Sequence, residues 1–132
     1  MIEKEIPFII CIIILFVHWL ADFVFQSHKM ATKKSTSKIW LTRHVLTYSL
    51  ITVALWTPFI IPLSEKEDII PNLCMVWIIT FVTHWFTDYV TSKITSRLYN
   101  EGKVHDFFVI VGVDQMIHYT TLLITYCFLI LK

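Results

Sequence analysis

The sequence is short of glycine and of charged residues: it has two glycines among 132 residues, and 16% of its residues are charged. Soluble domains average about 25% charged residues. The chain has no glycine-rich loop that could hold a nucleotide phosphate, no serine-nucleophile motif and no cysteine pair with metal-ligand spacing. Hydrophobic residues, by contrast, make up 56% of the chain and aromatic residues 15%. These proportions predict an integral membrane protein, and the net charge of +1 provides no basic excess for binding nucleic acid.

Four apolar stretches predict an all-α fold: a bundle of four transmembrane helices in a single integral membrane domain, residues 1–132. We expect the spans at about residues 7–26, 39–63, 71–94 and 107–131. Each stretch has about the 20 residues that a helix needs to cross a bilayer. Little of the chain is left for a domain outside the membrane, so the chemistry is expected inside the bundle or at its rim.

Basic residues are concentrated at one end of the predicted bundle. The loop after the first span, the start of the second span and the loop after the third span carry eight of them: Lys29, Lys33, Lys34, Lys38, Arg43, Lys93, Arg97 and Lys103. The opposite end carries three: Lys4, Lys66 and Lys132. Because the cytoplasmic loops of membrane proteins carry an excess of lysine and arginine, we expect both basic loops in the cytoplasm and both termini outside.

A short motif occurs twice, as His18-Trp19-x-x-Asp22-Phe23 in the first span and His84-Trp85-x-x-Asp88-Tyr89 in the third. A histidine and an aspartate four residues apart lie on one face of a helix. An aspartate at the centre of a membrane helix costs about 2.5–3.5 kcal/mol on insertion scales, so its repetition suggests a function. Because these two spans run in the same direction, we expect two parallel helical-hairpin repeats. The second halves of the repeats, around His44 and His118, match only weakly.

Seven ionisable side chains are expected at overlapping depths in the bundle: His18, Asp22, His44, His84, Asp88, Asp114 and His118. Asp114 and His118 again stand four residues apart. Imidazole and carboxylate together suit zinc, manganese or iron(II), and a bound divalent cation would neutralise the aspartates inside the membrane. We therefore predict a metal site, with zinc as the first choice of ion.

Such a site could be catalytic, as in a metal-dependent hydrolase that opens to the cytoplasmic side. Asp88 or Asp114 could act as a general base, and Arg43 at the cytoplasmic mouth could hold a phosphate. Arg43 could equally reflect the ordinary excess of basic residues on that side. The expected partners are the lipid bilayer and a phosphate-bearing or lipid substrate, and a homo-oligomer is left open.

Two other interpretations use the same residues. The polar side chains could hydrogen-bond across helices and only fix the bundle, as in a non-catalytic membrane interaction protein. They could instead conduct protons or metal ions across the membrane. The outer halves of the spans, such as residues 8–16 and 122–131, are almost wholly apolar, which favours a one-sided site over a channel.

Several of these residues also form a pattern that resembles a known family. Its elements are His18-x-x-x-Asp22-Phe23-x-x-Gln26, Arg43-His44, His84-x-x-x-Asp88 and Gly112-x-Asp114-Gln115-x-x-His118. Over nearly the whole chain they resemble a family of uncharacterised small four-helix inner-membrane proteins of bacteria and phages, a domain of unknown function. In addition, Arg43-His44-x-x-Thr47-Tyr48-Ser49 resembles in part the His-Arg-x-x-Thr-His-Ser element of small membrane-bound proteins described as predicted metal-dependent hydrolases. The resemblance implies a bacterial or phage-encoded protein of the inner membrane with a metal site.

Overall fold

The computed structural model describes residues 8–63 and 65–130. Within them the chain forms α1 (Phe8–Trp19), the π-helical turn η1 (Leu20–Val24), α2 (His28–Lys33), α3 (Lys38–Ile60), the 3₁₀ turn η2 (Ile61–Leu63), α4 (Ile69–Asn100) and α5 (Val104–Ile130). No strand occurs among these residues, so the prediction of an all-α fold is confirmed. Lys4, Lys132 and the expected span ends at residues 7 and 131 lie outside the described residues.

The long helices begin and end at local signals in the sequence. α3 begins after Ser37, whose backbone is extended, and ends shortly after Pro58. Pro71 is tolerated in α4 because it lies in the first turn, where a backbone N–H has no partner within the helix. Gly102 joins α4 to α5 with a φ of 70°, a left-handed conformation that glycine adopts without a Cβ clash. α4 and α5 therefore form one helical hairpin.

The segment after α1 differs from the prediction. We expected one span to residue 26 and then a loop, but the α-helix ends at Trp19, continues as the π-turn η1 and is followed by the short helix α2. A side-chain cap stabilises α2, because Ser27 Oγ accepts the backbone N–H of Met30 at 3.3 Å. π-turns are rare in helices and occur often at functional sites. Here the π-turn contains Asp22, one of the predicted metal ligands.

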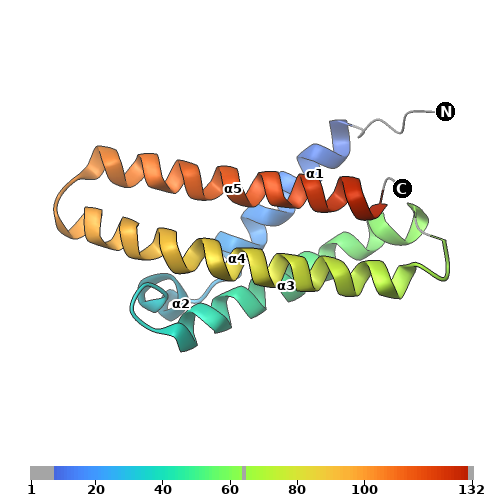
Figure 1. The fold of residues 1–132 in the computed structure, drawn as a ribbon, viewed down its shortest axis with the longest axis horizontal. Coiled ribbons are helices and arrows are strands. Elements are labelled where there is room, and N and C mark those ends of the chain that lie inside the picture. The colour runs from blue at the N-terminus through green and yellow to red at the C-terminus, as the bar shows by residue number, and fades with distance from the viewer. Residues whose placement is uncertain (1–7, 64, 131–132) are drawn as a thin grey trace.

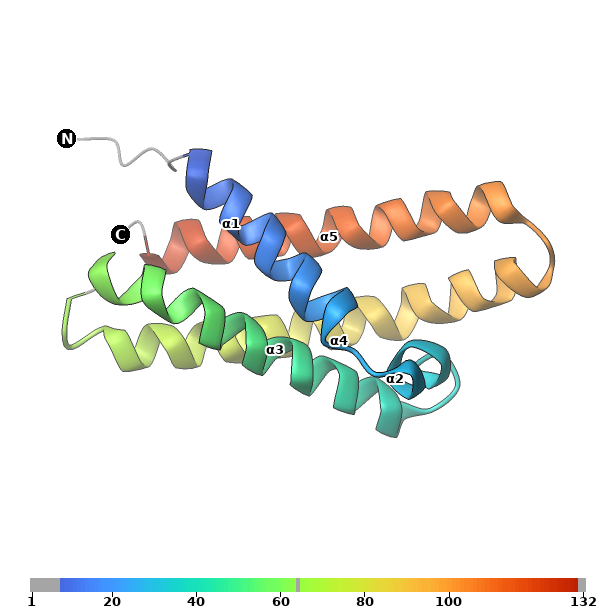
Figure 2. The same ribbon diagram turned by 180° about the vertical axis from the view of Figure 1, so that it is seen from behind.

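α3, α4 and α5 run along the long axis of the molecule, each antiparallel to the next (Figure 1). α1 crosses α3 and α5 obliquely (Figure 2), and it contacts both of them. α1 and α4 run in one general direction, and α3 and α5 run in the other. These directions agree with two repeated hairpins, but the oblique course of α1 makes the first hairpin more open than the second.

Two of the described helices, α4 and α5, are long and apolar enough to cross a membrane. The expectation of four such spans is thus met by two. The segment Phe8–Val24 is apolar but shorter. α3 is not among the helices that meet this criterion, and its first two turns carry Lys38, Arg43 and His44.

The buried interior has an apolar half and a polar half. The apolar half joins the middle and last turns of α1 to the ends of α3 and α5 and the start of α4. Its buried apolar residues are Ile14, Val17, Trp56, Ile60, Val76, Leu122 and Tyr126. Further along the helices, the buried side chains are mainly histidine, aspartate, threonine and serine. The apolar half therefore closes one side of the polar cluster.

Candidate metal centre

Six buried histidine and aspartate side chains from five helical segments meet in the polar half of the interior. They are His18 at the end of α1, Asp22 in η1, His44 near the start of α3, His84 and Asp88 in the middle of α4, and His118 in the middle of α5. None of them is more than 4% exposed. In α4 the spacing of four residues places both side chains on the face that meets the neighbouring helices.

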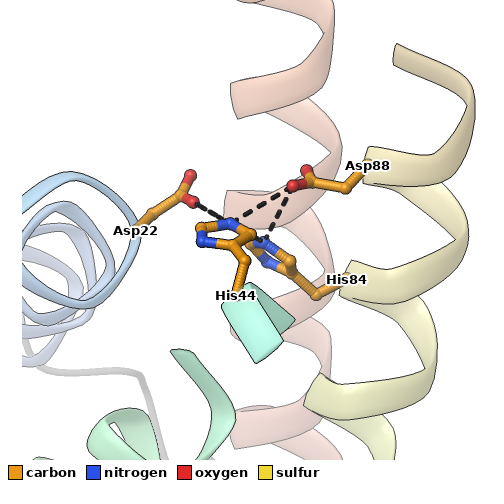
Figure 3. Close-up of side chains that lie close together, drawn as sticks. All are labelled: Asp22, His44, His84 and Asp88. Atoms are coloured by element: carbon orange, nitrogen blue, oxygen red, sulfur yellow. Dashed lines mark hydrogen bonds and ion pairs between the residues drawn. The ribbon is translucent and has the colours of Figure 1, made fainter. Parts of the chain in front are cut away.

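Four of these residues, Asp22, His44, His84 and Asp88, direct donor atoms toward one another (Figure 3). His44 Nε2 lies 3.0 Å from Asp22 Oδ1, 3.2 Å from Asp88 Oδ2 and 3.2 Å from His84 Nε2. His84 Nε2 lies 3.5 Å from each of the same two carboxylate oxygens. The Nδ1 atoms of both rings have no hydrogen-bond partner among the described residues, so each ring makes its polar contacts through Nε2.

These separations match the spacing of ligands around one small cation. A tetrahedral zinc ion with ligands at about 2.0–2.1 Å separates neighbouring ligand atoms by about 3.3–3.4 Å. The five separations between the nitrogen and oxygen atoms lie between 3.0 and 3.5 Å and bracket that value. Two imidazoles and two carboxylates also form a donor set that zinc, manganese and iron(II) accept. The cluster could therefore hold a divalent metal ion.

Lys34 adds a cation to this cluster. Its ammonium Nζ lies 2.7 Å from Asp88 Oδ2 and 3.4 Å from His44 Nε2, and its side chain is 20% exposed. Burial alone would lower the pKa of the ammonium, but the carboxylates of Asp88 and Asp22 outweigh burial and raise that pKa above its ordinary value. Lys34 is therefore charged and compensates one of the two buried carboxylates.

His18 is held at both ring nitrogens. Its Nδ1 lies 2.9 Å from the hydroxyl of Tyr48, and its Nε2 lies 3.0 Å from Gln115 Oε1. The Gln115 amide donates through Nε2 to Asp22 at 3.3 Å and to Asp114 at 3.0 Å, so its oxygen must accept from His18. The Tyr48 hydroxyl then donates to Nδ1. His18 is thus positioned within a hydrogen-bond network instead of offering a free lone pair.

His118 does offer a free lone pair. Its Nδ1 lies 2.8 Å from the backbone carbonyl oxygen of Asp114, and because a carbonyl only accepts, Nδ1 carries the proton. His118 Nε2 accepts no hydrogen bond among the described residues and lies 3.7 Å from Asp88 Oδ1.

The Asp114 carboxylate is oriented by Thr91, whose hydroxyl donates to Oδ1 at 2.5 Å. Asp88, Asp114 and His118 form a second set of ligand atoms within 4.8 Å of one another, and His18, Asp22 and His118 form a third.

A pocket of about 260 Å³ adjoins the cluster between η1, α2, α4 and α5. Its polar wall contains three carboxylates and several donors: Asp22, Asp88, Asp114, Lys34, Gln26, Gln115, Thr91, Ser92 and Thr95. The rest of the wall is formed by Phe23, Ala31, Phe107 and Val111. The cluster thus has a space beside it in which a small group could bind.

Arg43 lies apart from the cluster. Its side chain is exposed, and its guanidinium carbon lies 4.8 Å from the centre of the Trp40 ring. Among the described residues it forms no ion pair with Asp22, Asp88 or Asp114. The structure therefore brings together all seven predicted metal ligands and leaves out the predicted phosphate-binding arginine.

Three site residues were not predicted from the sequence. Lys34 was predicted only as one of the basic residues of the loop after the first span. Nothing in the sequence pattern of that loop indicates that α2 turns the chain back toward the bundle. Thr91 stands three residues after Asp88 and so lies on the same helix face, a signal that could have identified it. Gln115 belongs to the Gly112-x-Asp114-Gln115-x-x-His118 pattern noted in the sequence, but it was given no role in the site.

Comparisons with known proteins give one match. No curated protein and no solved structure matches the chain. The family described as "Protein of unknown function (DUF3307)" matches residues 10–132, a range that contains every residue of the cluster. The chain therefore belongs to the DUF3307 family.

Proposed function

We propose that this protein is a metal-dependent hydrolase embedded in a membrane, with Asp22, His44, His84 and Asp88 as its metal site. The observation that carries the proposal is the convergence of four buried donor atoms at separations of 3.0 to 3.5 Å. Buried carboxylates are costly unless a positive charge compensates them. Lys34 compensates one of the two carboxylates. The second positive charge can come from a protonated His44, 3.0 Å from Asp22, or from a bound cation that takes the place of this proton, and we assign it to the cation.

The surface of the helices supports a position within a membrane. Large side chains such as Phe16, Phe86, Phe108 and Phe128 are 56%, 63%, 64% and 73% exposed. In the most apolar stretches of α4 and α5, only 22% and 11% of the residues are buried, whereas a core helix of a soluble protein would be mostly buried. Apolar side chains outside and polar side chains inside suit a bundle in lipid. We assign all four long segments to it, with α1–η1 and α3 as the first hairpin and α4 and α5 as its repeat.

The basic residues support one orientation of this bundle. Eight lysines and arginines lie in or directly after α2, at the start of α3, at the end of α4 and in the α4–α5 turn, and these segments lie toward one end (Figure 1). By the positive-inside rule this end is cytoplasmic, which places both termini outside a bacterial inner membrane. The pocket borders α2 and therefore lies on the cytoplasmic side of the cluster.

The pocket and its residues suit hydrolysis. A divalent cation held by these four residues would polarise a phosphoryl or acyl oxygen of the substrate as a Lewis acid. It would also lower the pKa of the attacking water. Lys34 lies on the pocket wall and would stabilise negative charge that develops on a substrate oxygen. In a centre with one cation, Asp114 is placed to accept the proton of an attacking water, because its carboxylate borders the pocket and is oriented by Thr91 and Gln115.

The composition of the pocket suits an amphiphilic substrate. The carboxylates and Lys34 line the pocket together with the apolar side chains of Phe23, Phe107 and Val111. A volume of about 260 Å³ would hold a headgroup, while acyl chains would remain in the surrounding bilayer. A phosphate- or ester-bearing lipid is therefore the substrate class we assign. Transport is less well supported, because toward the other side the interior is mainly apolar and its buried polar groups, among the described residues, are threonines and Asn72, with no ionisable histidine or aspartate.

The test is lipid hydrolysis in mixed micelles by protein loaded with zinc or manganese. Phosphate-ester and carboxylic-ester lipids are offered separately, and product is measured before and after chelation and after return of the metal. We expect metal-dependent turnover that falls at least a hundredfold in Asp88→Asn and His84→Ala. His105→Ala is the matched control, because it removes an exposed histidine outside the cluster. If the loaded wild type hydrolyses neither lipid class, or if Asp88→Asn retains full turnover, the hydrolase assignment is wrong.

A further inference from the structure

We propose that a second divalent cation binds beside the first, held by Asp88, Asp114 and His118, and that Asp88 bridges the two ions. This inference rests on the proposed function, since it needs the first metal site. The three residues place ligand atoms within 4.8 Å of one another. The two ions together would form a dinuclear centre at the end of the pocket.

Asp88 has the geometry of a bridging carboxylate. Its Oδ2 faces the first site, 3.2 Å from His44 Nε2 and 3.5 Å from His84 Nε2. Its Oδ1 faces the other way, 3.7 Å from His118 Nε2. Each oxygen of this buried carboxylate therefore serves a different group of imidazoles.

The tautomer and the burial of His118 suit a metal ligand. It is 4% exposed, and its Nδ1–H donates to the backbone carbonyl of Asp114 at 2.8 Å. This bond fixes the tautomer and leaves a lone pair on Nε2, which accepts no hydrogen bond among the described residues. Metal-bound histidines almost always have such a hydrogen bond at the nitrogen that does not bind the metal. Among the described residues His118 has this bond, whereas the Nδ1 atoms of His44 and His84 have no partner. Nε2 of His118 faces the Asp88 carboxylate at 3.7 Å, whereas the Asp114 carboxylate lies 3.5 Å from Nδ1. A buried acceptor that faces a carboxylate without a donor is best explained by a cation.

Asp114 completes the second site and connects it to the pocket. Thr91 donates to its Oδ1 and Gln115 donates to its Oδ2, so the carboxylate is held in one orientation. Its side chain is 15% exposed and lines the pocket, whereas Asp22 and Asp88 are almost fully buried. Three protein ligands and an open side toward a pocket are what a catalytic metal site requires. In this centre Asp114 is a ligand instead of a general base.

The internal repeat supports two related sites. His18 Nε2 lies 3.6 Å from Asp22 Oδ2, and His84 Nε2 lies 3.5 Å from Asp88 Oδ2. In the same way, each aspartate turns its Oδ1 toward the histidine of the following long helix, at 3.0 Å for His44 and 3.7 Å for His118. The repeat is thus retained in the geometry of the ligands.

One difference between the repeats decides the ligands of the second site. His84 is free to bind through Nε2, whereas its counterpart His18 is engaged by Tyr48 and Gln115. Asp114, which has no acidic counterpart in α3, supplies the missing ligand beside His118. Each site therefore has two carboxylates, and the second has one imidazole where the first has two.

The experiment counts manganese ions, because Mn²⁺ accepts carboxylate and imidazole ligands and is paramagnetic. Detergent-purified full-length protein is stripped with chelator, loaded with Mn²⁺ and desalted, and bound metal is measured per chain. Electron paramagnetic resonance then distinguishes a magnetically coupled pair from isolated ions. We expect two equivalents with a coupled signal in the wild type, and one equivalent with an isolated-ion signal in Asp114→Asn. Asp106→Asn removes an exposed carboxylate from the same helix and should keep two equivalents.

The outcomes separate the two proposals. One equivalent of uncoupled manganese in the wild type would overturn the second site and leave the first intact. No bound metal would overturn both. The wild-type spectrum decides the question without any variant, so a folding defect in Asp114→Asn cannot obscure the result.

Discussion

Replacing Lys34 with glutamine should destabilise the metal-free protein and strengthen its binding of metal. Lys34 Nζ lies 2.7 Å from Asp88 Oδ2, and the Asp88 side chain is 2% exposed. Removing one partner of a buried ion pair costs about 3–5 kcal/mol. Because Lys34 is 20% exposed and Asp88 keeps His44 and His84 as neighbours, we expect a cost below this range, about 2–3 kcal/mol. In a chain of this size the melting temperature would fall by roughly 6–15 °C.

When metal is present, the same substitution should be favourable, because it should strengthen metal binding. An ammonium group beside a ligand oxygen repels an incoming cation, and two unit charges about 4 Å apart interact by about 4 kcal/mol at an effective dielectric constant of 20. The neighbouring pocket admits solvent and weakens this repulsion. We therefore expect Lys34→Gln to bind Mn²⁺ or Zn²⁺ at least about tenfold more tightly, which corresponds to about 1.4 kcal/mol.

The assay combines thermal unfolding in detergent, with and without metal, and titration of the stripped protein with Mn²⁺. Lys33→Gln is the matched control, because Lys33 is the preceding residue, is exposed, and has no side-chain hydrogen bond or ion pair among the described residues. The reasoning is refuted if Lys34→Gln melts like the wild type without metal, or if its affinity for metal is unchanged or lower.

Three further predictions concern the surroundings of the cluster. Thr91→Val removes the hydroxyl that orients Asp114, so the affinity of the second manganese site should fall about 10–100-fold in a titration while the first site is unaffected. Tyr48→Phe leaves a buried nitrogen of His18 without its donor and should lower the free energy of unfolding by about 1–3 kcal/mol, with metal content unchanged. Chelation of the wild type should lower the melting temperature, since metal at a thousandfold excess over its Kd stabilises the folded state by about 4 kcal/mol, and an unchanged melting temperature would contradict this.

The helices were predictable because apolar runs and local breakers determine them. Pro62, Asp68 and Gly102 lie between the long helices in the structure, as their chemistry predicts. The π-turn η1 and the short helix α2 were not predictable, because the first is a local deviation from regular helix geometry and the second depends on one serine cap.

The ligands were predictable because the spacing of four residues places a histidine and an aspartate on one helix face. That rule identifies His18 and Asp22, and likewise His84 and Asp88, but it gives no information on contacts between helices. The sequence therefore predicted the donors without showing that His18 would be occupied by Tyr48 and Gln115. It also missed Lys34, because the contact of a loop lysine with a buried aspartate depends on the path of the chain between them.

The most direct test of the metal site is elemental analysis of detergent-purified protein, wild type beside His84→Ala. His84 supplies one of four donor atoms that converge at 3.0 to 3.5 Å, and the site should lose most of its affinity without it. We predict at least one equivalent of zinc, manganese or iron per chain in the wild type and less than half as much in His84→Ala, with His105→Ala unchanged. A folded wild-type protein that is free of metal and takes none up when it is offered would contradict the account.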